Sequence, residues 1–232
     1  MSFGVAPGGR LAPIGRVDFK PEFVEQITER RAALRAELGT LLPRPTAIVW
    51  EVGCGHGHFL ARYATEFPHK RCFGVDLSSQ RIGRARRKSE RARLPNCHFL
   101  WAEALEFFHA LPAGVVFEEI WVLFPDPWPK KRHHKNRVLR PEFFEAIASR
   151  AGKGARLYFR TDHSEYFHEV AAFLPALGTW RPDPAAGWPL EPETVFQARA
   201  DNYHSLVAVR TSHPARRVET VAPGLPPPAG PK

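Results

Sequence analysis

The sequence predicts an α/β fold with a mostly parallel β-sheet. Short apolar segments rich in β-branched residues alternate along the chain with segments of helical periodicity. The helical segments are long enough to form the right-handed crossovers that join parallel strands. Ligands of such sheets bind beyond the carboxyl ends of the strands. The residues that follow each strand are therefore the first place to look for a functional site.

Five strands are expected in the body of the chain, and a helix is expected after each of them. Ser79 is a suitable cap for the second helix, and Pro141 suits the first turn of the fourth because its φ is fixed. The expected strands are Ala47–Val52, Arg71–Leu77, Cys97–Ala102, Glu119–Phe124 and Ala155–Thr161, with later strands at Thr194–Gln197 and Ser205–Arg210. The expected helices are His58–Phe67, Ser79–Ala92, a short one through Phe107 and Phe108, one that opens at Pro141, and Glu165–Leu174.

The chain length fits one folded domain with a tail at each end. At 232 residues, 44% hydrophobic and 25% charged, the composition excludes a wholly disordered chain. We expect a flexible segment over residues 1–18, a single domain over 19–213 and a proline-rich tail over 214–232. Apolar runs stop at about six residues, which predicts neither a membrane span nor a secretory signal. Three cysteines without CxxC spacing indicate a reduced, cytoplasmic setting.

The chain carries a net charge of +9, and most of the excess lies in two segments. Residues 81–93 contain seven basic residues and one acid, and residues 130–140 contain six basic residues and no acid. Outside these two segments the chain is slightly acidic. Concentrated positive charge of this kind makes a nucleic-acid partner plausible. A solvated helix face is the simpler interpretation of residues 81–93.

A glycine-rich turn follows the first expected strand and predicts an adenosine-containing cofactor. Glu51 precedes Gly53, Gly55 and Gly57, and Asp76 ends the second strand, where an acid can bind ribose hydroxyls. The spacing is GxGxG rather than the GxGxxG of dinucleotide sites. NAD and S-adenosylmethionine both remain possible. Glu51 suits the cationic sulfonium and ammonium groups of S-adenosylmethionine. This molecule also has no pyrophosphate, so it does not require the third glycine of the GxGxxG pattern.

Glu103 follows the third strand and has two possible roles. Its carboxylate could accept a hydrogen bond from an adenine amino group, or it could simply complement the dipole at the start of the next helix.

Alternating prolines make the segment after the fourth strand stiff and extended. In Phe124–Pro129 they hold Asp126 at the mouth of the site and leave the ring of Trp128 beside it, an arrangement typical of enzymes that stack a flipped base. The basic segment that follows favours phosphate contacts, made by Lys131, Arg132, His133, His134, Lys135 and Arg137. Although two histidines are adjacent, no acid or cysteine stands at ligand spacing, so no metal is expected.

Together these motifs resemble the bacterial tRNA (guanine-N7)-methyltransferase family. The resemblance covers about Phe19 to Arg210 and is most specific over FPDPWPKKRHHKNRVLR, with EVGCGHG, YFRTD and TVFQ in the expected order around it. It implies a class I S-adenosylmethionine-dependent methyltransferase fold, Rossmann-like, with a seven-stranded sheet covered by helices on both faces. It also implies methyl transfer from S-adenosylmethionine to N7 of guanine 46 in the tRNA variable loop, and no protein partner.

The resemblance also implies roles for individual residues. Asp126 would sit at the reacting centre. The donor would contact Glu51, Gly53, Gly55, Gly57, Asp76, Glu103 and Asp126, and the substrate would contact Lys130, Asp162, Thr194 and Gln197. The sequence departs from the family pattern in three places: Asp76 stands for a common Glu, Glu103 for a common Asp, and Gln197 for the Glu of a Thr-x-x-Glu motif. A Gln keeps one acceptor oxygen but loses the charge.

Methylation of guanine N7 needs no general base, because N7 carries a bare lone pair. Catalysis then consists of positioning and of negative charge near the developing cation. We expect Asp126 and Asp162 to hold the guanine while Glu51 and Asp76 hold the donor. Three alternatives stay open: a tRNA-binding protein weakened in catalysis, suggested by Gln197; an NAD-dependent oxidoreductase; and a methyltransferase that acts on another RNA base.

Overall fold

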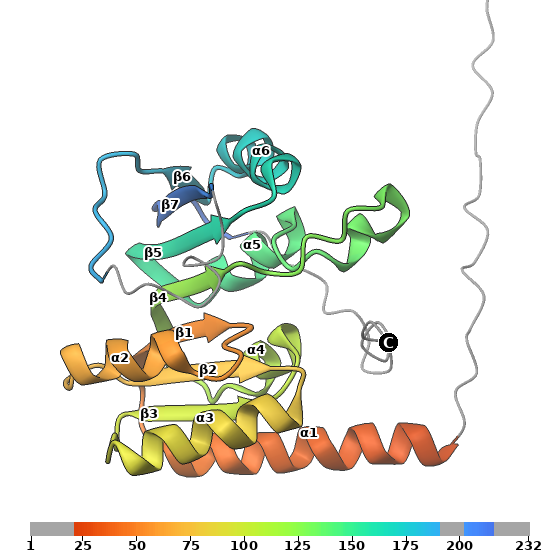
Figure 1. Ribbon diagram of the computed structural model, residues 1–232, viewed down its shortest axis with the longest axis vertical. Helices are drawn as coiled ribbons and strands as arrows, with labels where there is room; N and C mark the ends of the chain where they lie inside the picture. The colour runs from red at the N-terminus through yellow and green to blue at the C-terminus, as the bar shows by residue number, and fades with distance from the viewer. Residues whose placement is uncertain (1–20, 191–201, 216–232) are drawn as a thin grey trace, which may run out of the picture.

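A seven-stranded β-sheet forms the centre of the molecule (Figure 1). The computed structural model describes residues 21–190 and 202–215. Within them the strand order is β3-β2-β1-β4-β5-β7-β6, and neighbouring strands among the first five run parallel. β7 pairs antiparallel with both β5 and β6. The strands are β1 (Thr46–Val52), β2 (Cys72–Asp76), β3 (Cys97–Trp101), β4 (Val115–Leu123), β5 (Ala151–Thr161), β6 (Trp180–Pro182) and β7 (His204–Arg210).

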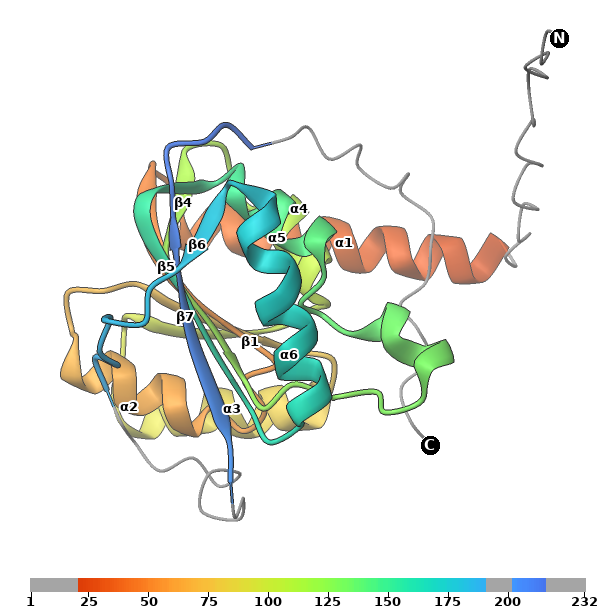
Figure 2. The ribbon, with the colours of Figure 1, turned by 90° about the horizontal axis from the view of Figure 1, so that it is seen from above.

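Helices cover both faces of the sheet (Figures 1 and 2). One face packs against α1, α4, α5 and α6, and the other against α2, α3 and the segment that contains Trp188. The helices are α1 (Pro21–Leu41), α2 (His58–Glu66), α3 (Ser79–Arg91), α4 (Ala104–Ala110), α5 (Pro141–Ala148) and α6 (Ser164–Phe173), with 3₁₀ turns η1 (Lys131–Asn136) and η2 (Leu174–Leu177).

Aromatic stacking fills the core on both sides of the central strands. On the α1 face, the ring centroid of Trp50 lies 5.0 Å from that of Phe117 and 5.1 Å from that of Phe107. On the α2 face, Trp121 stacks on Tyr158 at 3.9 Å. Aromatic pairs of this kind contribute about 0.5–1.5 kcal/mol beyond the area they bury. They pack β1, β4 and β5 against the helices on both faces of the sheet.

The three cysteines are free thiols in the interior. Cys72 and Cys97 are paired residues of β2 and β3, and Cys54 lies in the turn after β1. Burial raises the pKa of all three, that of Cys97 to about 12.

Most expected elements are present, and the differences have local causes. β4 begins at Val115 and β5 at Ala151, both earlier than expected, because polar and glycine residues interrupt the apolar pattern there. The expected strand Thr194–Gln197 lies outside the described residues, as do the whole expected N-terminal segment 1–18 and residues 216–232 of the expected C-terminal tail. β6, only three residues long, was not expected.

α1 was not predicted from the sequence. Its charged and alanine-rich surface gives little helical amphipathicity, yet Leu34, Leu38 and Leu42 lie four residues apart and are buried. Arg30 donates to both carboxylate oxygens of Glu106 in α4, at 2.6 and 2.8 Å. Packing against the finished domain, rather than helical propensity, therefore determines where α1 lies.

Parallel strands bring the loops that carry the expected functional residues to one edge. β1, β2, β3, β4 and β5 all end there. The strand order changes direction between β1 and β4, because the chain returns from β3, at one edge of the sheet, to place β4 on the other side of β1. Such a switch point opens a crevice in which α/β proteins bind their ligands.

We expect Leu38→Ala to lower the free energy of unfolding by about 2–5 kcal/mol, because it empties space around a fully buried side chain. Arg35→Ala, on the exposed side of the same helix, is the matched control and should change it by less than about 0.5 kcal/mol. Urea denaturation measures both. A loss below about 1 kcal/mol for Leu38→Ala would contradict the packing of α1 against the core.

Candidate functional site

The glycine turn after β1 has a backbone that only glycine adopts without strain. Gly53, Gly55 and Gly57 have φ values of +72°, +53° and +67°. A Cβ on Gly57 would lie 2.5 Å from the ring of Phe99, so this position also needs the small residue for space. The turn thus exposes backbone at the switch point, where a ligand can approach closely.

Glu51, at the end of β1, carries a buried carboxyl group that faces no cation directly. Its side chain is 4% exposed, and Oε2 has no hydrogen-bond partner among the described residues. Burial, helped by the nearby charge of Asp76, raises the pKa of Glu51 to about 8, although a backbone hydrogen bond from Leu60 and the charge of Lys88 act in the opposite direction. The carboxyl group is therefore mostly neutral at pH 7 and is suited to receive a cationic ligand, whose charge would favour the ionised form.

Asp76 shapes the glycine turn from the end of β2. Its Oδ2 accepts from the backbone N–H of Gly55 at 3.0 Å, and its Oδ1 accepts from that of Ser78 at 2.7 Å. Arg81 lies 3.7 Å from the same carboxylate. A carboxylate has about four acceptor positions, so these contacts leave capacity for hydroxyl donors of a ligand.

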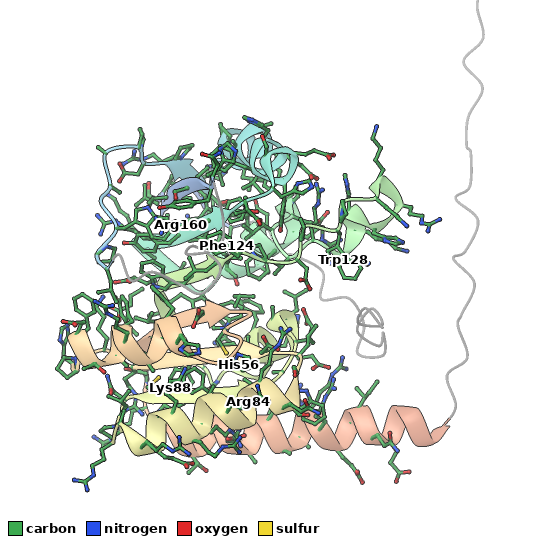
Figure 3. The ribbon with its side chains drawn as sticks, in the orientation of Figure 1. His56, Arg84, Lys88, Phe124, Trp128 and Arg160 are labelled. Carbon is green, nitrogen blue, oxygen red and sulfur yellow. The ribbon has the colours of Figure 1, made fainter. Side chains whose placement is uncertain are left out.

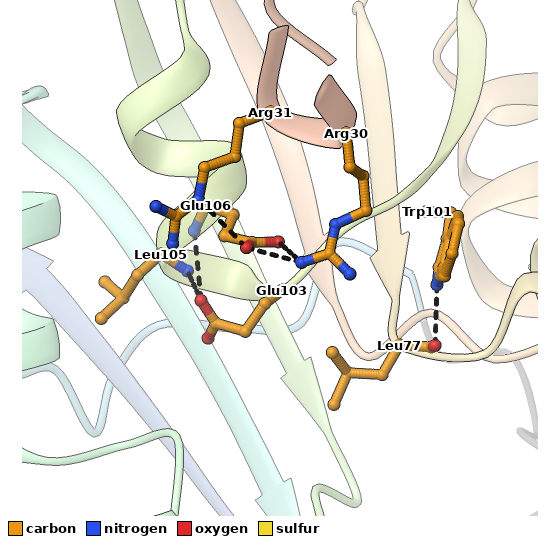
Figure 4. A network of polar contacts seen from close by, with 7 residues as sticks. All are labelled: Arg30, Arg31, Leu77, Trp101, Glu103, Leu105 and Glu106. Carbon is orange, nitrogen blue, oxygen red and sulfur yellow. Dashed lines mark hydrogen bonds and ion pairs between the residues drawn. The ribbon is translucent and has the colours of Figure 1, made fainter. Parts of the chain in front are cut away.

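Glu103 caps α4, which is the simpler of its two expected roles. Its Oε2 accepts from the backbone N–H of Leu105 at 2.8 Å and of Glu106 at 3.1 Å (Figure 4). Burial raises its pKa, while these N–H donors lower it. The carboxylate still lies at the carboxyl end of β3. The cap therefore orients it without excluding the expected contact with a ligand.

Two aromatic residues in left-handed conformations frame the loop after β4. Phe124 has φ +48° and Trp128 has φ +45°, which costs energy for bulky residues and is typical of functional loops. The backbone N–H of Phe124 donates to the carbonyl of Arg160 in β5 at 2.7 Å. Between the two aromatic residues, Asp126 is exposed at the edge of the sheet.

Most residues of the expected RNA-binding segment reach solvent. Lys130 precedes the 3₁₀ turn η1, which carries Lys131, Arg132 and Lys135, and all four are exposed. Figure 1 shows this turn projecting beyond the sheet. We call residues 130–135 the basic loop.

The two histidines of the basic loop are half-buried. The ring of His133 packs edge-on against Trp128, with centroids 5.8 Å apart. His134 Nε2 lies 3.7 Å from a carboxylate oxygen of Glu165.

Arg137 differs from the other residues expected to contact RNA, because its side chain is buried. It is 1% exposed, its Nε donates to the carbonyl of Pro127 at 2.8 Å, and it forms an ion pair with Glu169. Its guanidinium lies 4.8 Å from the centre of the Tyr166 ring. This arginine connects the loop after β4 to α6, so we assign it a structural role in place of the expected phosphate contact.

Asp162 lies beside the Asp126 loop, as expected from the strand order. Leu123 of β4 pairs with Arg160 of β5, so the chain segments that carry Asp126 and Asp162 leave the sheet from adjacent strands. Asp162 is exposed. Thr194 and Gln197, the other expected substrate contacts, lie outside the described residues.

Sequence analysis missed Arg160, although its surroundings are distinctive. The side chain is 4% exposed, and its guanidinium carbon lies 3.9 Å from the centre of the Trp188 ring and 4.7 Å from that of Tyr203 (Figure 3). Its Nε donates to Ser205 at 2.9 Å. These partners come from distant parts of the chain, so no local pattern could have indicated the contact.

Residues 21–190 and 202–215 contain neither a candidate metal site nor a candidate membrane-spanning helix. No three His, Cys, Asp or Glu side chains there form a group that could hold a metal ion. Over the same range, no helix has the length and apolar character needed to cross a bilayer.

Comparison with known proteins relates this arrangement to methyltransferases. The family model described as "Putative methyltransferase" matches residues 45–195. The tRNA (guanine-N(7)-)-methyltransferase of Treponema pallidum is 36% identical over 159 residues, which cover 67% of this chain and 62% of that protein. The enzyme of the same name from Syntrophotalea carbinolica is 28% identical over 205 residues, covering 85% and 88%. The chain thus spans somewhat less than two thirds of the first relative.

One solved structure has a similar overall fold. The 16S rRNA methyltransferase KamB superposes with a TM-score of 0.53 at 20% identity, covering 76% of this chain and 93% of that one. This likeness bears on the fold alone and confirms the predicted class I S-adenosylmethionine-dependent methyltransferase fold. Because the family model matches more than half of the chain, the protein belongs to this methyltransferase family.

Proposed function

We propose that the protein transfers a methyl group from S-adenosylmethionine to N7 of guanine 46 in the variable loop of tRNA. The observation that carries the proposal is the buried Glu51 carboxyl group, with one oxygen unpartnered, beside the glycine turn of a methyltransferase fold. The names of the curated relatives support the choice of guanine N7 and of tRNA. Cytoplasmic localisation, where tRNA is modified and used, is part of the same proposal.

The residues at the ends of β1, β2 and β3 fit S-adenosylmethionine. Glu51 would face its cationic part, Asp76 its ribose hydroxyls, and Glu103 the adenine amino group. Gly53 and Gly55 border open space where it could lie against the backbone, while Gly57 lets the turn pack on Phe99. When bound, this molecule supplies an electrophilic methyl group whose transfer moves positive charge from sulfur to the purine. Negative side chains near that path favour the transition state.

Carboxylates and cations form the part of the site that would bind the methyl acceptor, the tRNA. In the proposal, Asp126 contacts both substrates at the reacting centre, and Asp162 accepts from the guanine N1–H and amino group. Lys130, Thr194 and Gln197 complete the substrate contacts, while Lys131, Arg132, His133, His134 and Lys135 contact the RNA backbone. No residue needs to remove a proton, since guanine N7 carries none. Orientation by such contacts can lower a barrier by about 7–11 kcal/mol in favourable cases.

The direct test uses purified protein, unmodified tRNA and S-adenosylmethionine labelled in its methyl group. We expect label in the tRNA as 7-methylguanine, and mapping of the modified base should locate it at position 46. A transcript with adenine at that position is the matched control and should take up no label. Label in a different base would contradict the proposal and favour the alternative of another RNA base. Binding of tRNA without any transfer would favour a weakened binding protein.

Asp126→Asn should reduce methyl transfer about 10²–10³-fold, the usual cost of losing one electrostatic contact to a transition state. The exposed acid Glu142, at the start of α5, supplies the matched control: Glu142→Gln makes the same change of charge and should leave turnover within about twofold. Single-turnover rates with saturating tRNA measure the effect, and circular dichroism verifies the fold. Near-normal turnover in Asp126→Asn would contradict the placement of Asp126 at the reacting centre.

Affinity for S-adenosylmethionine should fall as pH is lowered from 8.5 to 6.5. Because the pKa of Glu51 is raised to about 8 in the free protein, the group must lose a proton to face a cation, and affinity approaches a tenfold loss per pH unit well below 8. Isothermal titration calorimetry measures this. Glu51→Gln should bind weakly without that slope, and a wild-type slope in the variant would assign the pH dependence to another group.

The same pKa has an opposite consequence for stability. Since the folded value lies above the ordinary value of 4.5, the folded state binds a proton more tightly, and stability declines as pH rises from about 4.5 to 8. Glu51→Gln should lack this decline, and melting temperatures at pH 6 and 8.5 will show whether it does.

A further inference from the structure

α3 presents a strip of arginines to solvent that the proposed mechanism does not use. Ile82, Ala85 and Ser89 turn one side of the helix into the core. The opposite side exposes Arg84, Arg87 and Arg91, spaced three and four residues apart. At 1.5 Å per residue the strip extends about 10 Å along the helix. We call these three residues the outer arginine strip.

The fold itself gains little from this strip. In the described part of the chain, no carboxylate lies within 4 Å of any of its three arginines, whereas Arg81 and Arg86 at its flanks pair with Asp76 and Glu37. Like charges three or four residues apart destabilise a helix by a few tenths of a kcal/mol per pair. A cluster of cations that costs stability and has no protein counter-charge is complementary to a polyanion.

The strip begins next to the glycine turn. Arg84 lies 3.4 Å from His56 Nε2, and the neighbouring Lys88 donates to the His56 carbonyl at 2.9 Å (Figure 3). α3 follows β2 and the basic loop follows β4, and these strands flank β1. Since adjacent strands lie 4.7–4.9 Å apart, the strands that lead into the two basic elements are about 10 Å apart across the switch point.

We propose that the outer arginine strip binds the phosphate backbone of tRNA on the side of the site opposite the basic loop. When a nucleotide of an RNA chain enters at the switch point, the sugar–phosphate backbone extends from it in both directions. The outer arginine strip then lies on one side of that nucleotide and the basic loop on the other. The inference rests on the proposed function. Nucleic acid fits better than a lipid surface, because none of the large hydrophobic side chains exposed in the described residues lies on α3.

The test compares two pairs of neutral substitutions that remove equal charge. Arg87→Gln/Arg91→Gln changes the strip but leaves Arg84 and Lys88 in contact with the glycine turn. Arg44→Gln/Lys153→Gln removes the same charge from exposed positions before β1 and early in β5, at the opposite edge of the sheet. Lys131→Gln/Arg132→Gln, in the basic loop, is the reference for a change at an expected RNA contact.

Binding of unmodified tRNA is measured between 50 and 300 mM salt, together with methyl-transfer kinetics. For the strip variant we expect about tenfold weaker binding near 100 mM salt, and a slope of log affinity against log salt that is smaller by about 1.4–1.8, as for two lost phosphate contacts. KM for tRNA should rise while kcat and the affinity for S-adenosylmethionine stay unchanged. The edge variant should match the wild type.

Each other outcome has a distinct meaning. If the wild type methylates tRNA but the strip variant binds it no more weakly than the edge variant does, the inference is overturned while the proposed function stands. If the strip variant loses binding to vesicles that contain 30% phosphatidylserine but keeps its tRNA affinity, the surface binds lipid and the inference is likewise overturned. If the wild type itself transfers no methyl group to tRNA, the proposed function fails, and the salt slopes still decide whether α3 binds RNA.

Discussion

The common direction of five strands is the constraint on which the candidate site depends. Because β1 to β5 are parallel, the chain segments that leave β1, β2, β3, β4 and β5 all reach one edge, although up to 111 residues separate Glu51 from Asp162 in sequence. The reversal of strand order between β1 and β4 places the glycine turn and the Asp126 loop side by side. Stacked aromatic residues pack these strands on both faces of the sheet. The sheet thus brings the acids considered for binding to one edge, and local backbone N–H donors then orient Asp76 and Glu103.

Charge is divided between the inside and the outside of this edge. Glu51, Asp76 and Glu103 are largely buried at strand ends, where burial raises the pKa of Glu51 and Glu103. The cations lie on the outer surface, on the basic loop and on α3. A positive surface attracts a polyanion over a distance comparable to the Debye length, while the buried acids act only on a group that has entered the site. Although Arg81 at the start of α3 approaches Asp76 to 3.7 Å, the outer arginine strip and the basic loop face solvent, so the two sets can serve long-range capture and short-range recognition.

Sequence patterns were sufficient to find β1 to β5, β7 and the glycine turn, and to place acids at the strand ends, because each of these depends on local periodicity or on a residue at a strand end. They could not predict α1, whose leucines are buried only because the rest of the domain is present. They assigned Arg137 to RNA because it lies among basic residues, whereas Pro127, Tyr166 and Glu169 enclose it. They did not indicate the role of Arg160 either, because its partners Trp188 and Tyr203 lie far from it in the chain. In each case the missing information was a contact between segments far apart in the chain.

The three interior cysteines bear on how the molecule can be studied. Reaction with maleimides or iodoacetamide requires a thiolate, and thiols of raised pKa inside the protein supply almost none at neutral pH. A single cysteine introduced on the surface would thus be the only fast-reacting thiol of the described residues, and the native three could remain in place. Fluorophores or spin labels attached singly to α3 or to the basic loop would then report on either side of the crevice in an otherwise unaltered protein.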